Sequence, residues 1–141
     1  MKGRNNIPIS PNFNLREFEN RDGYVMLHSS ILEGLEAVRE IINEELGTPI
    51  GIFITNAVRT QGDNNRLASK LGWTDQGGTV SRTSKHLWKY GGIAVDIIGV
   101  FLDNGEIMDQ KMLVPICQEH FDWVRDYKDG HIHCDNRERA K

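Results

Sequence analysis

The sequence predicts a single α+β domain over residues 1–141, with an antiparallel sheet flanked by helices on one side. The chain length fits one domain, and an apolar content of 38% with a charged content of 26% is typical of a globular protein. Strand-like and helix-like segments follow one another without a regular βαβ alternation, which argues against a parallel sheet. A turn dipeptide between the last two strand-like segments indicates a hairpin, and therefore antiparallel pairing.

The first two predicted elements are an N-terminal arm and a long helix. Residues 1–12 are polar and contain two prolines, which indicates an extended arm. A helix is predicted from about Ser30 to Leu46, because apolar residues recur there every three or four positions. We expect Ser30 and Glu33 to form its capping box and Gly47 to end it. This helix is expected to supply the core and no chemistry.

The rest of the chain is predicted to form short strands and short helices. Their boundaries follow from β-branched and aromatic runs and from Gly, Pro and Asp-Gly signals. Pro115 must lie in the first turn of its helix or break that helix. In chain order we predict a strand over 50–58, a helix over 64–71, a loop over 73–85, a strand over 93–100, a turn at 103–105, a helix over 108–120, and strands over 121–125 and 131–134.

Charge and composition restrict the classes of partner that the protein can bind. The net charge of -3 gives no basic field for nucleic acid or for an anionic membrane surface. No apolar run approaches the roughly 20 residues that span a bilayer, and the first ten residues lack the apolar stretch of a signal peptide. We therefore expect a monomer made in the cytoplasm. Cys117 and Cys134 are expected to be reduced, buried thiols.

Asp96 is the most informative single residue, because it lies inside an apolar strand over 93–98. An unpaired carboxylate in such a place is very costly, so it needs a cationic partner. One interpretation pairs Asp96 with Arg59 or another basic residue. The other makes Asp96 a metal ligand, and this residue by itself does not decide between them.

Two histidine signals favour the metal. In a strand, His131 and His133 point to the same face while Ile132 enters the core, although a solvated edge with two unrelated histidines has the same pattern. His86 precedes the strand that carries Asp96 and can fold over its end. His86, Asp96 and His133 together offer two nitrogens and one oxygen, the ligand set of a catalytic zinc with an open fourth position.

These residues resemble the D-alanyl-D-alanine carboxypeptidase-like zinc metallopeptidases, a superfamily shared with the hedgehog signalling domain. The family motif S-x-H-x-x-G-x-A-x-D resembles SKHLWKYGGIAVD at 84–96, and its distal H-x-H resembles the end of FDWVRDYKDGHIHCD at 121–135, which is close to the hedgehog version. The segment TNAVRTQGDN at 55–64 matches in part the block S-G-x-R-x-x-x-x-N. The segment NFNLREFE at 12–19 is similar to the start of small phage and bacterial members.

The resemblance implies a hedgehog/DD-peptidase-like fold and a zinc ion held by His86, Asp96 and His133. It implies that Arg59 receives a substrate carboxylate. It also places Asn64 and Ser84 beside that arginine, although a hydroxyl that caps the loop is an equal interpretation of Ser84. The expected activity is hydrolysis of peptidoglycan stem peptides, by a D-alanine carboxypeptidase or an L-alanyl-D-glutamate endopeptidase, as in a phage endolysin or virion protein.

Two departures from the family pattern concern the spacing and the catalytic acid. Three extra residues, near 88–90, separate His86 from Asp96. The family acid lies three residues before the last histidine, where this chain has Gly130, and the hedgehog acid lies six before it, where this chain has Tyr127.

The catalytic roles are therefore expected from nearby residues. Asp129 is our candidate general base, although a plain turn aspartate has the same sequence signal. His131 is expected to stabilise the oxyanion. Asp135 either holds a ligand histidine or is an exposed strand end. Two other classes stay open: a non-catalytic, hedgehog-like zinc-containing binding module, and a metal-free fold in which Asp96 pairs with Arg59.

Overall fold

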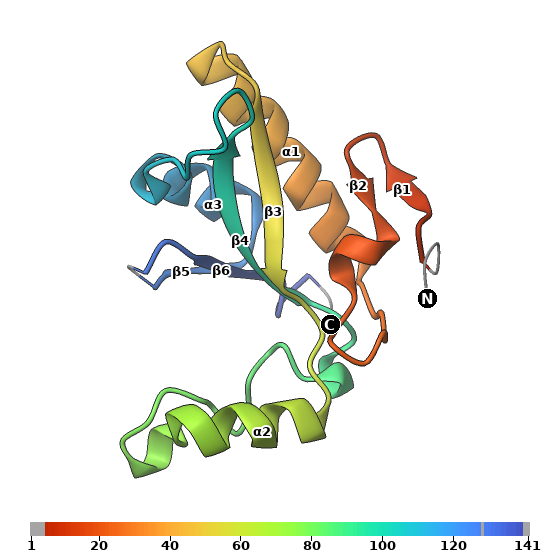
Figure 1. The fold of residues 1–141 in the computed structure, drawn as a ribbon, viewed down its shortest axis with the longest axis vertical. Helices are drawn as coiled ribbons and strands as arrows, with labels where there is room; N and C mark the ends of the chain where they lie inside the picture. The colour runs from red at the N-terminus through yellow and green to blue at the C-terminus, as the bar shows by residue number, and fades with distance from the viewer. Residues whose placement is uncertain (1–4, 128, 140–141) are drawn as a thin grey trace.

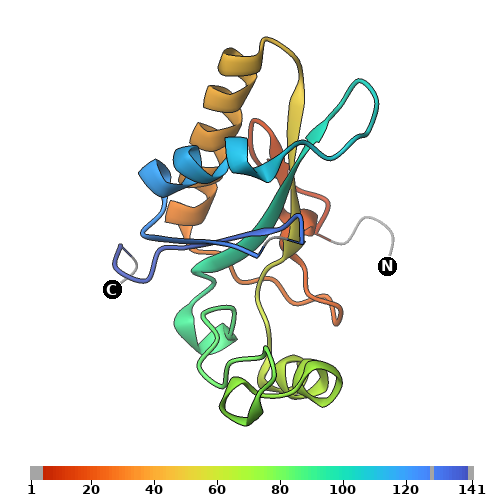
Figure 2. The same cartoon turned by 90° about the vertical axis from the view of Figure 1, so that its left-hand side faces the viewer.

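The computed structural model describes residues 5–127 and 129–139 and confirms the α+β class. A four-stranded antiparallel sheet has the order β3-β4-β6-β5, and a separate hairpin joins β1 to β2. Helices α1 and α3 cover one face of the sheet, whereas α2 lies apart beyond one end of it (Figure 1, Figure 2). The elements are β1 Pro8–Ser10, β2 Phe13–Asn14, α1 Ser29–Leu46, β3 Ile50–Asn56, α2 Gln61–Leu71, β4 Ala94–Phe101, α3 Val114–His120, β5 Trp123–Asp126 and β6 Ile132–Asp135.

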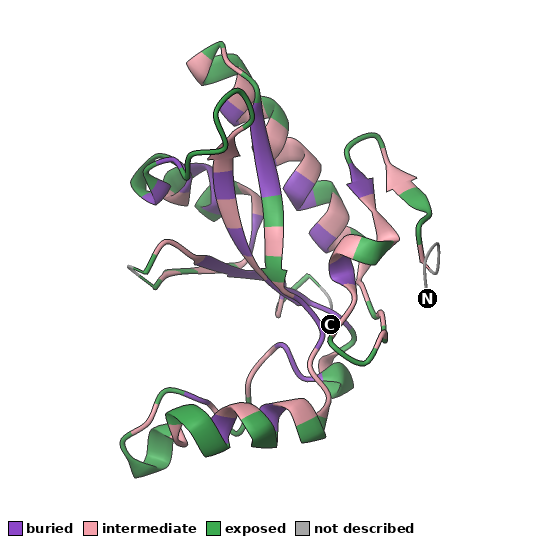
Figure 3. Ribbon diagram, viewed as in Figure 1, coloured by how far each residue is buried: buried purple, intermediate pink, exposed green. Residues whose placement is uncertain are grey.

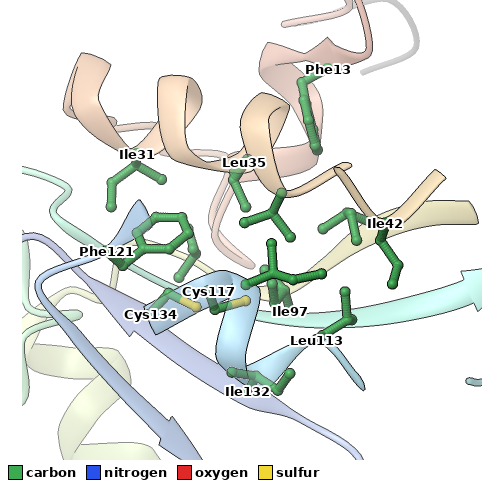
Figure 4. Packing of buried hydrophobic residues seen from close by; sticks show 14 of the residues in the cluster. Phe13, Ile31, Leu35, Ile42, Ile97, Leu113, Cys117, Phe121, Ile132 and Cys134 are labelled. Carbon is green, nitrogen blue, oxygen red and sulfur yellow. The ribbon is translucent and has the colours of Figure 1, made fainter. Parts of the chain in front are cut away.

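The core lies between α1, α3 and the sheet. The buried positions of α1 recur along the side that faces the sheet (Figure 3), and their side chains interdigitate with those of β4, β6 and α3 (Figure 4). Cys117 and Cys134 belong to this core, and both are free thiols, as expected. Fully buried core side chains include Phe18, Ile31, Leu35, Val38, Ile42, Ile50, Val95, Ile97, Leu113 and Ile132.

The start of α1 differs from the prediction. His28, two residues before the expected Ser30, is the N-cap, and its Nδ1 accepts a hydrogen bond from the Ser30 N–H at 3.2 Å. The predicted capping box of Ser30 and Glu33 is therefore wrong. The Ser30 hydroxyl instead contacts His28 Nδ1 at 2.8 Å and accepts from Asn136 Nδ2 at 2.9 Å. Gly47 ends the helix in the left-handed conformation, as predicted.

Other boundaries shift by a few residues. Helix α2 begins at Gln61, three residues early, because Thr60 and Asp63 form a capping box that the sequence reading missed. Pro115 lies in the first turn of α3, as required, but the helix itself starts only at Val114. The predicted arm is instead a hairpin over part of its length, since β1 pairs with β2. Within the described residues no helix is long and apolar enough to cross a membrane.

Candidate metal centre

Asp96 and His133 face each other from adjacent strands. Asp96 is the third residue of β4, and the register pairs it with His133 of β6. Directly opposed residues project to the same face of a sheet, so both side chains point away from α1 and α3. Ile97 and Ile132, the next residues of the same two strands, point the other way into the core, as predicted for Ile132.

His86 reaches the same place from the loop before β4. The Arg59 N–H donates to the His86 carbonyl oxygen at 2.6 Å, and the Trp88 N–H donates to the Arg59 carbonyl oxygen at 2.7 Å, which ties this loop to the segment after β3. The extra residues of the spacing fold locally into a 3₁₀ turn, η3 (Trp88–Tyr90). The longer spacing therefore leaves His86 beside Asp96.

The three side chains form a compact triangle of ligand atoms. His86 Nε2, His133 Nδ1 and Asp96 Oδ1 are each 3.1 Å from the other two. Zinc bonds of roughly 2.0–2.1 Å in a tetrahedral arrangement separate neighbouring ligand atoms by about 3.3 Å. The side chains are 3%, 6% and 14% exposed for His86, His133 and Asp96. The triad can therefore hold a metal ion.

Hydrogen bonds to the outer nitrogen of each imidazole orient the other nitrogen, as an acceptor, toward the centre of the triad. His86 Nδ1 lies 2.8 Å from the Ala57 carbonyl oxygen, which only accepts, so Nδ1 carries the proton and Nε2 presents a lone pair. His133 Nε2 lies 2.8 Å from Asp135 Oδ2, which assigns its proton in the same way and leaves Nδ1 as the acceptor. Two lone pairs and a carboxylate oxygen repel one another unless a cation or extra protons lie between them.

The ionisation of the triad reflects this need for positive charge. Burial raises the pKa of Asp96, but hydrogen bonds from His133 and His86 outweigh burial and hold that pKa well below its usual range. Burial lowers the pKa of His133, yet hydrogen bonds to Asp135 and Asp96 bring it above the usual value of 6.5. Without metal the His133 imidazole therefore tends to take up a proton, and a divalent cation supplies the same positive charge.

The metal-free interpretation required an ion pair between Asp96 and Arg59. Among the described residues, Asp96 contacts His86 and His133, and Asn56 Nδ2 lies 3.5 Å from its second oxygen. Arg59 instead donates through Nη1 to Asn64 and Ser84. The predicted alternative pair is therefore wrong.

Asp135 is a buried partner of a ligand, and the expectation that it is an exposed strand end is wrong. Its exposure is 0%. Arg137 donates hydrogen bonds to both of its oxygens, with Nε 2.9 Å from Oδ1 and Nη2 2.7 Å from Oδ2. Burial raises the pKa of Asp135, but the hydrogen bonds from Arg137 and His133 keep it well below its usual range. An ionised carboxylate behind His133 orients the ring and makes it a stronger ligand.

His131 lies near the triad without joining it. Its Nδ1 is 3.1 Å from Asp129 Oδ1, and the same oxygen accepts from the His131 backbone N–H at 3.0 Å. The His131 side chain is 40% exposed and that of Asp129 is 64% exposed. Both line the cleft described below. Their catalytic roles stay predictions.

Arg59, Asn64 and Ser84 come together as one cluster. Arg59 Nη1 donates to Asn64 Oδ1 at 2.9 Å and lies 3.3 Å from Ser84 Oγ. Asn64 is fully buried in α2 and donates to the Ser81 carbonyl oxygen at 3.1 Å, so the amide is a fixed support. Burial lowers the pKa of Arg59, which still remains charged at neutral pH.

The triad and this arginine cluster line one wide cleft. Its volume is about 1580 Å³, and its lining residues come from the sheet, from α2 and from the loops on either side of α2. Small-molecule sites usually measure about 300–1,000 Å³, so this cleft has room for a segment of a polymer. Its basic lining residues are Arg21, Arg59, Arg66, Lys70, Lys85, Arg125 and Arg137, and its acidic ones are Glu17, Glu19, Asp63, Asp96 and Asp129.

Two aromatic residues beside His133 were missed by sequence reasoning. The Trp123 ring meets the His133 ring edge-on at 5.4 Å between centroids, and Arg137 lies over Trp123 at 4.5 Å. The Tyr127 ring meets His133 at 6.2 Å. Burial raises the pKa of Tyr127 to about 12, and the Asp96 carboxylate adds to the rise. The signal that could have identified them is the alternation of side chains along the strand that pairs with the H-x-H segment.

Fold and site together define the class: an α+β protein with a buried centre of two imidazoles and one carboxylate in an open cleft, able to bind a metal ion. Compared with known proteins, the chain matches no protein-family model, no curated protein and no solved structure.

Proposed function

We propose that this protein is a zinc-dependent peptidase that hydrolyses peptide bonds in the stem peptides of bacterial peptidoglycan. The observation that carries the proposal is the buried triad of His86, Asp96 and His133 in the wall of a cleft wide enough for a polymer. The motif resemblance supplies the substrate class. It also suggests the cell wall as the site of action, as for a phage lysis or virion protein.

The donor set favours zinc among the divalent metals. Calcium takes six to eight oxygen ligands and magnesium retains water in an octahedron of oxygens, whereas this centre offers two nitrogens and one oxygen. Three protein ligands leave a fourth tetrahedral position open, as in catalytic zinc sites. When bound, zinc lowers the pKa of a coordinated water to about 7 and polarises a substrate carbonyl.

The residues around the triad suit the proton transfers of amide hydrolysis. The backbone N–H of His131 donates to Asp129 and lowers its pKa, so this carboxylate is ionised at neutral pH and can accept the proton of the attacking water. The same proton then passes to the leaving amine. His131, hydrogen-bonded to Asp129, lies beside this path and is our sequence-based candidate for the oxyanion.

Arg59 suits a substrate that carries a free carboxylate. Asn64 and Ser84 contact its Nη1, so the guanidinium is held in one orientation within the cleft. A planar, permanently charged fork binds a carboxylate through paired hydrogen bonds. Stem peptides carry such carboxylates at D-glutamate and at the terminal D-alanine, so both carboxypeptidase and endopeptidase action are compatible with this placement.

The test combines metal analysis with digestion of peptidoglycan. The purified protein should contain about one zinc ion per chain. Incubation with purified peptidoglycan should release fragments whose masses identify the bond, while the Asp96→Asn variant releases none. Protein that neither binds zinc nor gains thermal stability from added zinc would show that the metal assignment is wrong.

The alternative function is a non-catalytic, zinc-containing binding module of the hedgehog kind. It is favoured by Gly130 and Tyr127, which stand where the family and hedgehog acids are expected. It is also favoured by the exposure of Asp129, which is bonded to His131. This module would bind zinc and retain peptidoglycan in a pull-down, yet release no fragment. Release of fragments by the wild-type protein would reject it.

A further inference from the structure

Strand β5 presents a row of side chains to the metal centre. Trp123 is paired with Asp135, and Arg125 with His133, so both project to the sheet face that carries the triad. The Tyr127 N–H donates to the His131 carbonyl oxygen at 3.2 Å, which continues this ladder beyond the end of β5. Tyr127 is therefore the third member of the row, at the end nearest to the loop that carries Asp129.

The Tyr127 ring lies in the cleft beside His133 of the triad. Its ring meets the His133 ring edge-on at 6.2 Å, and the Arg125 guanidinium lies 5.3 Å over the same ring. Tyr127 lines the cleft, and its hydroxyl has no hydrogen-bond partner within the part of the chain that the structure describes.

His131 is less suited to donate a hydrogen bond to an oxyanion. Its Nδ1 faces the ionised Asp129, so in the neutral ring this nitrogen carries the proton and Nε2 is an acceptor. A phenol, in contrast, donates throughout the neutral pH range, because its ordinary pKa is about 10.

We propose that Tyr127 is a catalytic residue whose hydroxyl donates a hydrogen bond to the oxyanion of the tetrahedral intermediate. This inference rests on the proposed function. In the step concerned, a water oxygen forms a bond to the substrate carbonyl carbon, and the carbonyl π pair moves onto the carbonyl oxygen. The water proton passes to Asp129. The Tyr127 proton stays on its own oxygen and only shares a hydrogen bond.

The collapse of the tetrahedral intermediate cleaves the C–N bond and returns the transferred proton. The oxygen pair re-forms the carbonyl, the C–N bond breaks, and the leaving nitrogen takes the proton from Asp129. Because the negative charge exists only in the intermediate and the flanking transition states, the Tyr127 hydrogen bond strengthens there and lowers the barrier without tightening substrate binding.

The experiment compares the wild-type protein with Tyr127→Phe, which removes only the hydroxyl and keeps the ring against His133. Turnover of purified peptidoglycan gives kcat and KM. Phosphinate pseudodipeptides that mimic the D-Ala–D-Ala and L-Ala–D-Glu bonds report binding of a tetrahedral oxyanion. Tyr24→Phe is the matched control, because it makes the same chemical change at a phenol that is 64% exposed and does not line the cleft.

We expect Tyr127→Phe to lower kcat by about 10²–10³ with KM unchanged, the usual effect of removing one oxyanion donor. Phosphinate affinity should fall with kcat, while zinc affinity and melting temperature stay at wild-type values. Retention of kcat and of phosphinate affinity would overturn this inference and leave the proposed function intact. Loss of zinc affinity together with kcat would also overturn it, because Tyr127 would then act by supporting His133. A wild-type protein without turnover would reject the proposed function and this inference together.

Discussion

The direction of the His133 lone pair depends on two residues outside the triad. Arg137 holds both oxygens of Asp135, and Asp135 holds the protonated Nε2 of His133. This chain of charge-assisted hydrogen bonds commits one ring nitrogen and thereby turns Nδ1 toward Asp96. A rotated ring would present an N–H to the centre and would no longer bind a cation.

Asp135→Asn tests this arrangement at the scale of one atom. The variant keeps the shape of the side chain but loses the charge behind His133, so zinc affinity should fall by about 10–100-fold with the three ligands intact. Competition with a chelator measures the affinity. Asp103→Asn, at an exposed turn away from the site, should leave it unchanged. Equal zinc affinity in the wild type and Asp135→Asn would refute the role of Asp135.

Arg59 offers a second prediction at this scale. Hydrogen bonds to a charged group contribute about 1.5–3 kcal/mol, so Arg59→Ala should raise KM for stem peptides by about 10–100-fold. The triad does not contact this guanidinium directly, so zinc content should be unchanged. Steady-state kinetics and metal analysis check both points. An unaltered KM in Arg59→Ala would mean that the substrate carboxylate binds elsewhere.

The sequence was most informative about the three residues of the triad and least about the residues that hold them in place. Asp96 stood out because few partners make a carboxylate tolerable between Val95 and Ile97. Asp135 did not stand out, because its burial depends on Arg137 folding back onto it after the last strand. That is a tertiary contact, and no periodicity in the sequence encodes it.

At the scale of elements, strand register determines whether the site exists. The pairing of β4 with β6 places Asp96 opposite His133, and a slip by one residue would turn one of them into the core. Val95, Ile97 and Ile132 resist such a slip, because each is fully buried on the other face. The same alternation that builds the core therefore aligns the ligands.

The entry of the chain into β4 depends on a pair of glycines. Gly91 and Gly92 both have positive φ, at 83° and 73°. A Cβ at Gly91 would meet nothing within 4 Å, whereas one at Gly92 would lie 2.2 Å from the Met26 carbonyl oxygen. Gly92 also accepts a hydrogen bond from the His28 N–H at 3.0 Å, so it joins the α1 N-terminus to the start of β4.

This contrast predicts different costs for two neighbouring substitutions. Gly91→Ala should lower the free energy of unfolding by about 1 kcal/mol, the conformational cost of a left-handed alanine. Gly92→Ala adds a backbone clash and should cost clearly more. Urea denaturation of the metal-free protein measures both values. Similar losses for the two variants would show that the segment around Met26 yields to the new methyl group.

The elements were predictable where local signals dominate. The apolar period of α1, the stop at Gly47 and the place of Pro115 follow from single-residue physics. The start of α1 was not, because His28 competes with Ser30 for the cap and its imidazole accepts the bond that a serine normally would. The turn η3 was likewise invisible, since three inserted residues give no signal of how they fold.

At the scale of the molecule, the sheet has two faces with different tasks. Helices α1 and α3 cover one face (Figure 1). The triad occupies the other face, where residues of α2 and its loops help to line the cleft. The sequence predicted helices on one side of the sheet, but not that the helix over 64–71 would instead lie beyond one end of the sheet and line the cleft. That placement depends on how the segment after β3 leaves the sheet, and in particular on the bridge between Arg59 and the His86 loop.

The charges of the whole site predict how stability without metal varies with pH. The pKa values of Asp96 and Asp135 in the folded protein lie below the ordinary 3.8, so their contribution is present above that pH and is lost on further acidification. The pKa of His133 lies above 6.5, so its contribution is complete below 6.5 and is lost as the pH rises through the folded value. Metal-free protein should therefore be most stable between these limits.

If the triad binds zinc as proposed, zinc should reverse the upper half of this profile, because it would bind the neutral imidazoles and compete with protons for His133. Zinc at about 100 times its dissociation constant adds about 2.7 kcal/mol, which raises the melting temperature on the order of 5–10 °C. The rise should be large at pH 8, where the metal-free protein has lost the His133 contribution, and small at pH 5.5, where protonation occupies the same centre. Melting curves with chelator and with zinc across this range provide the measurement. His133→Gln should abolish the zinc-dependent rise at both pH values, whereas an equal rise at pH 5.5 and pH 8 in the wild type would mean that zinc binds outside the triad.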